Sequence, residues 1–427
     1  MRKWSWRPAN VILVVILVVS LIACAFLASH QITTGGIQAK YTFSDAEVGT
    51  TDDNTYRVLA ADDNGTVYIS EALATWVPPA QRACLISLDV NGDARWRIGT
   101  NVMLQELTIG CDGNLYCVDL TNSSDWQSET LVFNNLTAYD VHGHRLWNYI
   151  SNGSLSIWGV FPDGTMIVER NGSMLMGIRN GTVLWERGLV DYPFTFLDHS
   201  VFLNDTMVVL SYDDDQSSAL ALNEDGEVVW SVPLGSRPYF VSSMCGNITY
   251  EMFEEWSGST AVTCVVALNI TDGSLLWETI LDQHEAMQPG LNYTGSVAYV
   301  DGKGVVYAHH NGTLYALASN GELLWKKVSV QTPRAAFETG GVLVGNETIL
   351  KRIDPEGNVI WQYVSERPLP DQSIAVGKDV VYVAGGNKMM ALSQFTISGD
   401  ISLILVIISF DILAIISYII WHKPVKT

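Results

Sequence analysis

The sequence predicts an all-β protein, a single β-propeller of eight four-stranded blades, alternatively seven, with a transmembrane helix at each terminus. Three observations predict this architecture. A short unit that ends in tryptophan recurs seven times, a second hairpin pattern precedes several copies, and an apolar segment lies near each end of the chain.

The repeated unit has a polar residue, then a glycine, and a tryptophan four positions after the glycine. The first copy reads LDVNGDARW at 88–96, and the last reads IDPEGNVIW at 353–361. A polar residue followed by glycine favours positive φ angles and a tight hairpin turn, so each tryptophan falls on the strand after the turn. The seven tryptophans are Trp96, Trp147, Trp185, Trp230, Trp277, Trp325 and Trp361.

A second hairpin pattern lies upstream of these units, for example DNGTVYIS at 63–70 and PDGTMIVE at 162–169. Two hairpins amount to four short strands, which is one propeller blade. The tryptophans recur roughly every 44 residues, so residues 41–395 accommodate eight blades. The half-unit at 376–395 has no closing tryptophan. We expect the strand-like YTFSDAEV at 41–48 to complete it and to close the ring.

The unit ALASNGELLW at 316–325 and its relatives resemble the PQQ-like (quinoprotein-type) propeller repeat. That repeat is also found in the outer-membrane assembly lipoprotein of Gram-negative bacteria. The resemblance covers roughly residues 55–395 and implies that the seven tryptophans are structural residues that dock onto the neighbouring blade. Quinoprotein enzymes have adjacent cysteines and a calcium site, for which this sequence has no match. We therefore expect no cofactor, no metal site and no catalytic residues.

The two ends of the chain predict membrane attachment. Residues 8–29 are interpreted as a transmembrane signal anchor and residues 399–421 as a second transmembrane helix, with cytoplasmic tails at 1–7 and 422–427. Basic residues lie on the outer flank of each segment, which places both termini in the cytoplasm and the propeller, residues 41–395, outside the cell membrane. A cleaved signal peptide and lipidation at Cys24 remain as alternatives for the first segment.

Asp411 interrupts the second apolar segment. A carboxylate inside a bilayer is costly unless it is neutral, paired or facing protein. Asp411 is therefore a candidate for contact with a partner helix in the membrane, either residues 11–28 of this chain or another membrane protein. An isolated, tolerated acid is the alternative.

Twelve Asn-x-Ser/Thr sequences lie between the two apolar segments, which supports export and predicts N-glycosylation. Asn-Gly-Thr is also a good turn sequence, which is an alternative explanation for a few of them. The twelve candidates are Asn64, Asn122, Asn135, Asn152, Asn171, Asn180, Asn204, Asn247, Asn269, Asn292, Asn311 and Asn346.

The charge balance excludes nucleic acid as a partner, because 45 Asp and Glu against 24 Lys and Arg give a surface that repels phosphate backbones. Outside a cell, cysteines can form disulfides. Cys245 with Cys264 is one expected pair, and another is expected among Cys84, Cys111 and Cys117.

Three other groups suggest metal ligation less strongly than they suggest structural roles. His142 and His144 flank the glycine of a repeat turn, and His309–His310 point to opposite faces of a strand. Asp213–Asp215 is interpreted as a solvated acidic loop.

These observations favour a non-catalytic propeller exposed at the cell surface, which acts as a binding or scaffold module for protein or glycan partners. Two alternatives are a quinone- or small-ligand-binding oxidoreductase or sensor, and a purely structural envelope glycoprotein.

Overall fold

The computed structural model describes residues 35–43, 54–62, 64–73, 83–100, 104, 106–120, 133–189, 196–203, 205–213, 216–234, 237–257, 259–285, 297–365, 369, 374–377, 379–385 and 388–396. Both predicted transmembrane segments, with Cys24 and Asp411, lie outside these residues. Within the described part of the chain, no helix is long and apolar enough to cross a membrane.

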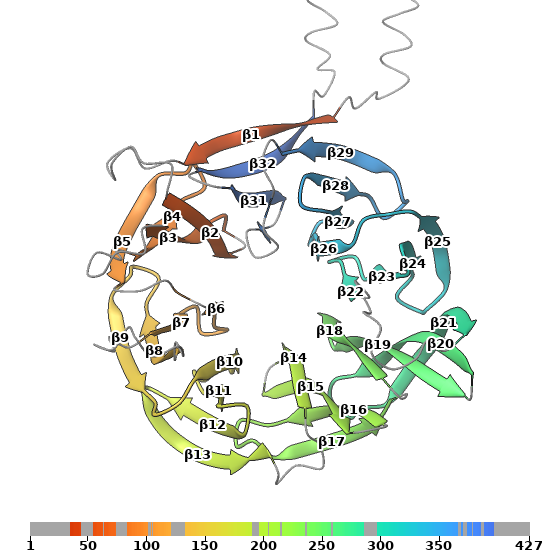
Figure 1. The fold of residues 1–427 in the computed structure, drawn as a ribbon, viewed down its shortest axis with the longest axis horizontal. Helices are drawn as coiled ribbons and strands as arrows, with labels where there is room; N and C mark the ends of the chain where they lie inside the picture. The colour runs from red at the N-terminus through yellow and green to blue at the C-terminus, as the bar shows by residue number, and fades with distance from the viewer. Residues whose placement is uncertain are drawn as a thin grey trace, which may run out of the picture. The chain divides into compact units, whose positions relative to one another are not determined.

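Residues 37–393 form one compact unit, a ring of eight four-stranded sheets (Figure 1). Seven of the sheets take their four strands in sequence order, from an inner strand to an outer one. This confirms the prediction of an eight-bladed β-propeller and excludes seven blades.

The first four blades are formed by sixteen consecutive strands. Blade one contains β2 (Asn54–Ala61), β3 (Val67–Leu73), β4 (Ala83–Leu88) and β5 (Ala94–Thr100). Blade two contains β6 (Glu106–Ile109), β7 (Leu115–Leu120), β8 (Phe133–Tyr139) and β9 (Arg145–Ile150). Blade three contains β10 (Leu155–Val160), β11 (Met166–Arg170), β12 (Met174–Arg179) and β13 (Thr182–Gly188). Blade four contains β14 (Phe196–Leu203), β15 (Thr206–Asp213), β16 (Gln216–Leu222) and β17 (Val228–Pro233).

The next three blades repeat this order. Blade five contains β18 (Arg237–Cys245), β19 (Ile248–Ser257), β20 (Thr260–Asn269) and β21 (Leu275–Glu285). Blade six contains β22 (Val297–Val300), β23 (Val306–His310), β24 (Thr313–Leu317) and β25 (Leu323–Val328). Blade seven contains β26 (Pro333–Ala336), β27 (Val342–Gly345), β28 (Ile349–Ile353) and β29 (Val359–Val364).

The eighth blade combines both ends of the unit. Its three inner strands are β30 (Ile374–Val376), β31 (Val380–Gly385) and β32 (Lys388–Thr396), and its outer strand is β1 (Gly35–Phe43). The N-terminal strand therefore closes the ring, as the sequence predicted, although it begins at Gly35 rather than at residue 41. Pairing of β1 with β32 gives the last blade its fourth strand and joins the two ends of the unit.

A β-bulge precedes the repeat tryptophan in each of the first seven blades. In blade six, for example, Ala316 pairs with Trp325 while Leu317 pairs with Leu323, so Leu324 is the extra residue. The corresponding extra residues elsewhere are Arg95, Leu146, Leu184, Val229, Leu276 and Ile360. A bulge bends the strand and redirects the following side chain, which here turns the indole toward the next blade.

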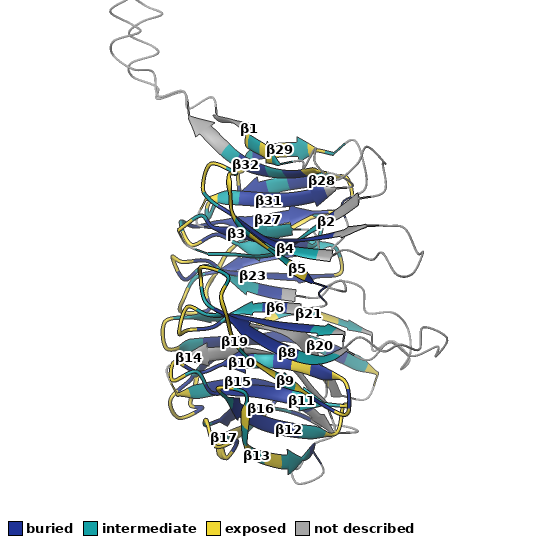
Figure 2. Ribbon diagram, turned by 90° about the vertical axis from the view of Figure 1, so that its left-hand side faces the viewer, coloured by how far each residue is buried: buried dark blue, intermediate teal, exposed yellow. Residues whose placement is uncertain are grey.

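The core lies between the sheets. Every residue of the second strands β23 and β27 is buried (Figure 2). The apolar clusters span neighbouring blades, since Tyr116 of blade two packs in one cluster with Met166 of blade three. One such cluster joins Tyr56 of blade one to Tyr382 of blade eight, so apolar packing also supports the closure.

Candidate functional site

All seven repeat tryptophans lie on the outer strands, and those of the first six blades contact the turn of the following blade. In five blades the indole Nε1 donates a hydrogen bond to a backbone carbonyl of that turn, at 2.7–2.9 Å. The donors and acceptors are Trp96 with Val141, Trp185 with Glu224, Trp230 with Ile270, Trp277 with Ser319, and Trp325 with Pro355. Each bond joins two sheets that share no ladder.

The glycine of the next turn makes this contact close. A Cβ at Gly273 would lie 2.7 Å from the Trp230 ring, and Gly273 has a φ of +70°. Trp147 lies against Gly181 in the same way, at 3.4 Å. Trp361 is 5% exposed, and its Nε1 has no hydrogen-bond partner among the described residues. The glycine of the motif therefore has two roles: it adopts the positive φ of the turn, and its missing side chain lets the indole ring of the preceding blade come close.

None of the predicted glycosylation candidates within the described residues is buried. Seven are exposed: Asn64, Asn152, Asn171, Asn180, Asn247, Asn311 and Asn346. Asn135 and Asn269 are half-buried, and Asn122, Asn204 and Asn292 lie outside the described residues. Asn171, Asn180 and Asn311 have positive φ angles, so these three also serve as turn residues.

The expected disulfides do not form, because all five cysteines after Cys24 are free thiols. Cys245 pairs with Ile248 and Cys264 pairs with Phe253. Five strand residues separate these positions, roughly 17 Å, which exceeds the reach of a disulfide. Burial raises the pKa of the Cys264 thiol to about 12, with a smaller contribution from the nearby Glu278 carboxylate.

Two of the three groups weighed as possible metal ligands keep a structural interpretation or cannot be described. His142 and His144 are exposed in the turn of blade two, where His144 Nδ1 lies 3.0 Å from Asp140 Oδ2. Asp213 ends β15, and Asp214 and Asp215 follow it outside the described residues.

The outer strands carry most of the exposed large aliphatic side chains. Among the described residues, only Val90 and Val141 of this class lie elsewhere, in turns. The others lie on six consecutive outer strands: Leu146, Ile150, Leu184, Val228, Val229, Leu275, Leu276, Ile280, Leu323, Leu324, Val328, Val359 and Val364. We call these residues the aliphatic rim. Exposed apolar patches of this kind mark surfaces that bind other proteins.

A polar cluster lies between blades five and six. Asp282 and His284 stand on β21, and His310 ends β23 of the next blade. Each offers one potential ligand atom, and the three atoms lie within 4.8 Å of one another. The rings of His284 and His310 have centroids 5.2 Å apart.

Three further residues contact these imidazoles. Nε2 of His284 lies 2.8 Å from Oε1 of Glu254, which is 1% exposed. Nε2 of His310 lies 2.8 Å from the amide nitrogen Nδ2 of Asn311 and 3.3 Å from the hydroxyl of Thr263. Burial lowers the pKa of His310, and the neighbouring His284 lowers it further.

The sequence interpretation assigned His310 a structural role and did not single out Asp282 or His284. The unusual length of the strand around Asp282 and His284 was a local signal for this cluster. β21 has 11 residues, whereas the other outer strands with described tryptophans have 6 or 7, and the extra residues carry Asp282 and His284. What the sequence did not show is that blade six places His310 beside them.

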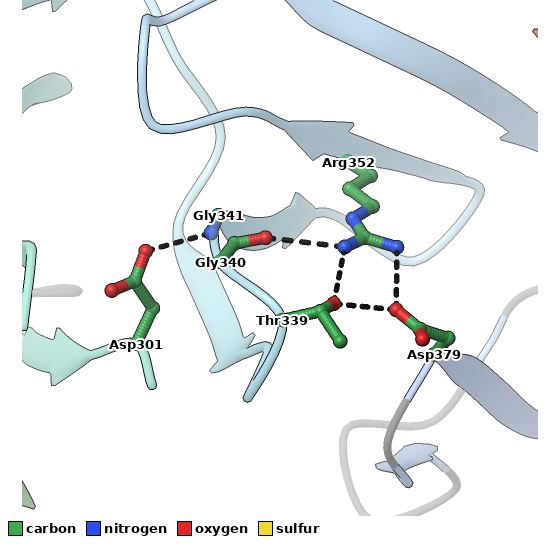
Figure 3. A network of polar contacts seen from close by, with 6 residues as sticks. All are labelled: Asp301, Thr339, Gly340, Gly341, Arg352 and Asp379. Atoms are coloured by element: carbon green, nitrogen blue, oxygen red, sulfur yellow. Dashed lines mark hydrogen bonds and ion pairs between the residues drawn. The ribbon is translucent and has the colours of Figure 1, made fainter. Parts of the chain in front are cut away.

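A second polar network joins blades six, seven and eight (Figure 3). It connects Arg352 on β28 with residues in the turns between the first and second strands of these blades. Arg352 donates hydrogen bonds to Thr339 Oγ1 at 2.9 Å and to the carbonyl of Gly340 at 3.1 Å. Its guanidinium also lies 3.5 Å from Asp379 Oδ1 of blade eight. Asp301 of blade six, 2% exposed, accepts a hydrogen bond from the backbone of Gly341 at 2.7 Å.

We interpret this network as structural, because most of its groups contact one another, although Nε of Arg352 is buried without a hydrogen-bond partner among the described residues. The Arg352 guanidinium also lies over the Phe337 ring, 3.9 Å from its centroid. Burial lowers the pKa of Arg352, and the Asp379 carboxylate opposes that shift.

A shallow pocket of about 460 Å³ lies between blades four and five. It is lined by Asp205, Thr206, Asn223, Val229, Asn247, Ile270 and Thr271. Its polar lining belongs to the turns, and Asn247 there donates hydrogen bonds to Asn269 and Thr271.

Solved structures with the same fold are distant in sequence. BamB from Moraxella catarrhalis is 13% identical, with 84% of this chain and 97% of that chain covered and a TM-score of 0.49. The Dos1 propeller is 11% identical, with 84% and 95% covered and a TM-score of 0.52. Sqt1 from Chaetomium thermophilum, solved bound to the N-terminus of the ribosomal protein L10, is 11% identical, with 80% and 97% covered and a TM-score of 0.48.

At 11% identity, the Dos1 propeller shows a shared fold alone. No curated protein sequence matches the chain. A sequence model of the family described as outer membrane protein assembly factor BamB matches residues 132–344 and 261–396, two overlapping stretches that together span more than half of the chain. The chain therefore belongs to the BamB family of PQQ-like β-propellers.

Proposed function

We propose that this chain is a protein-binding scaffold propeller displayed on the outer side of a cell membrane. The observation that carries the proposal is the aliphatic rim, which leaves apolar side chains in water on six neighbouring outer strands. The name of the family, an assembly factor of outer membrane proteins, supports a partner that is itself a protein.

The rim combines two features that favour contact with an extended segment of a partner protein. Each outer strand is the last in its sheet, so one side of its backbone is unpaired. Apolar side chains flank that free edge, with Leu323, Leu324 and Val328 on β25 between 50% and 71% exposed. A partner strand or apolar segment laid along the edge would cover both.

The remaining parts of the proposal concern location. The apolar segments 8–29 and 399–421 would hold the propeller at the membrane, and Asp411 would contact a partner helix there. The seven exposed asparagine acceptors support an extracellular, N-glycosylated surface. Comparing the mass of the purified chain with and without its N-glycans tests that part on its own.

Crosslinking in native membranes tests the rim. The full-length protein and a variant carrying Leu323→Thr, Leu324→Thr and Val328→Thr are crosslinked in parallel, and the captured proteins are identified by mass spectrometry. Threonine keeps the strand preference while removing apolar surface. We expect one defined protein to be captured by the wild type and to be reduced at least about tenfold with the variant.

A second variant serves as the matched control. Val90→Thr and Val141→Thr remove two valines, 39% and 46% exposed, from the turns outside the rim. This control should capture the partner as the wild type does. Equal capture by all three proteins, at unchanged thermal stability, would refute binding through the rim.

A further inference from the structure

We propose that Asp282, His284 and His310 form a binding site for a divalent transition-metal ion, with Zn²⁺ as the expected ion, that links blade five to blade six. The atoms that these residues offer already lie within 4.8 Å of one another. Ligand atoms around a tetrahedral zinc ion are roughly 3.3 Å apart, given bond lengths of about 2.0–2.2 Å. Rotation of the side chains would provide the remaining approach.

The backbone places the three residues for this purpose. Asp282 and His284 are two positions apart on β21, so their side chains point to the same face of the strand. A register shift between Thr263 and Cys264 on the paired strand β20 falls opposite Asp282 and bends β21 there. His310 reaches this face from blade six, where its ring lies beside that of His284.

An unsatisfied atom points to a missing ligand. Nδ1 of His284 is buried and has no hydrogen-bond partner among the described residues, and it lies 3.9 Å from Asp282 Oδ2. The other ring nitrogen, Nε2, is in contact with the carboxylate of Glu254. A carboxylate at one nitrogen with the second nitrogen bare is how metal-binding histidines are oriented. Glu254 is therefore a positioning residue rather than a ligand.

The donor set selects the type of ion. Two imidazole nitrogens and one carboxylate oxygen suit Zn²⁺ and its neighbours in the first transition row. Ca²⁺ and Mg²⁺ prefer oxygen ligands only. Two carboxylates, Asp282 and Glu254, balance the charge of a dication in this partly buried place. Asp282 is 40% exposed, which leaves an entry path and a fourth coordination position for water.

Metal titration of the full-length protein tests the site. The chain is freed of metal with a chelator and titrated with Zn²⁺ by calorimetry, and with Co²⁺ by visible absorption. We expect one tight equivalent for the wild type, with a cobalt band typical of low coordination number. His284→Gln, His310→Gln and Asp282→Asn should each weaken the affinity about tenfold or more. Zinc should also raise the thermal midpoint of the wild type but not that of the His284→Gln/His310→Gln double variant.

Two controls separate this site from other histidines. His309→Gln changes the residue next to His310. Nε2 of His309 contacts the carbonyl of Val330 and not the cluster. His142→Gln/His144→Gln removes the exposed pair in blade two, whose rings are 6.2 Å apart. Both control variants should still bind one equivalent of metal tightly.

The proposal is overturned if the wild type takes up no Zn²⁺ or Co²⁺, or if His284→Gln and Asp282→Asn bind as tightly as the wild type. Asp282→Asn decides the matter if the buried histidine variants fail to fold, because Asp282 is the most exposed of the three.

Discussion

The ring of Tyr41 lies against Gly92, where a Cβ would collide with it, and the Tyr41 hydroxyl donates a hydrogen bond to the carbonyl of Asp89 at 3.4 Å. Tyr41 stands on β1 of the eighth blade, and Gly92 lies in the outer turn of the first. In the first six blades a tryptophan occupies the equivalent place against the next turn. The N-terminal strand thus supplies both the last ladder of the ring and its last blade-to-blade contact.

We predict that Tyr41→Ala weakens the closure. Removing a half-buried aromatic side chain at this joint should lower the free energy of unfolding by about 2–3 kcal/mol. Tyr41→Trp should lose much less, because an indole fits the same place in the first six blades. Urea denaturation followed by circular dichroism measures both variants. Equal midpoints for Tyr41→Ala and the wild type would show that the contact does not contribute.

Two glycine variants separate turn strain from blade contact. Gly273 and Gly113 both have positive φ angles, +70° and +79°, so alanine strains the backbone by about 1 kcal/mol at either site. Only at Gly273 does the new methyl meet the Trp230 ring, since open space surrounds Gly113. Gly273→Ala should therefore cost about 1–3 kcal/mol more than Gly113→Ala. Thermal unfolding of the two variants side by side measures the difference, and equal losses would argue against tight docking.

Arg352 should contribute far more to stability than a superficially similar arginine. Arg352→Met leaves the Thr339 and Asp379 groups without their cation and should cost about 2–3 kcal/mol. Arg187 also bridges two blades, with its Nη2 3.5 Å from Glu227, but both groups are exposed. Arg187→Met should change stability by less than about 0.5 kcal/mol. Denaturant titration compares the two, and a loss at Arg187 as large as at Arg352 would contradict the assignment.

The turn aspartates should make the ring sensitive to acid. Hydrogen bonds from the backbone of residues 91–93 lower the pKa of Asp89, and those of residues 142–144 lower that of Asp140. A carboxylate with a lowered folded-state pKa stabilises the fold above its unfolded pKa, near 3.9, and loses this contribution as the pH falls through the folded value. Thermal midpoints should therefore drop below about pH 4.

Asparagine variants check the origin of that drop. Asp89→Asn/Asp140→Asn keeps a side-chain acceptor in each turn but removes the titrating group. The double variant should show a smaller decrease in thermal midpoint between pH 5 and pH 2.5 than the wild type. A decrease of the same size would assign the acid sensitivity to other carboxylates.

The repeat was readable from sequence because its physical causes are local. A polar residue followed by glycine, as at Asn320–Gly321, makes a tight turn wherever it occurs, and four residues later Trp325 falls on the next strand by strand geometry alone. Seven copies with the same glycine-to-tryptophan offset therefore predicted blades. The unfinished copy after Trp361 predicted that the N-terminal strand would close the ring.

The disulfide expectation failed for the opposite reason. Cys245 and Cys264 are near in sequence, but strand register places them far apart along blade five. Register depends on pairing across the sheet, which spacing along the chain does not specify.

By itself the sequence determined the all-β class, the blade repeat, the acidic balance and the position of the asparagine acceptors, since each depends on residues close together in the chain. Only the tertiary structure decided which partners meet across blades. It placed His310 beside His284, turned thirteen aliphatic side chains outward as a rim, and put Tyr41 where an eighth tryptophan would stand. Such contacts arise when separate sheets pack side by side around a ring, and no local pattern records which faces will touch.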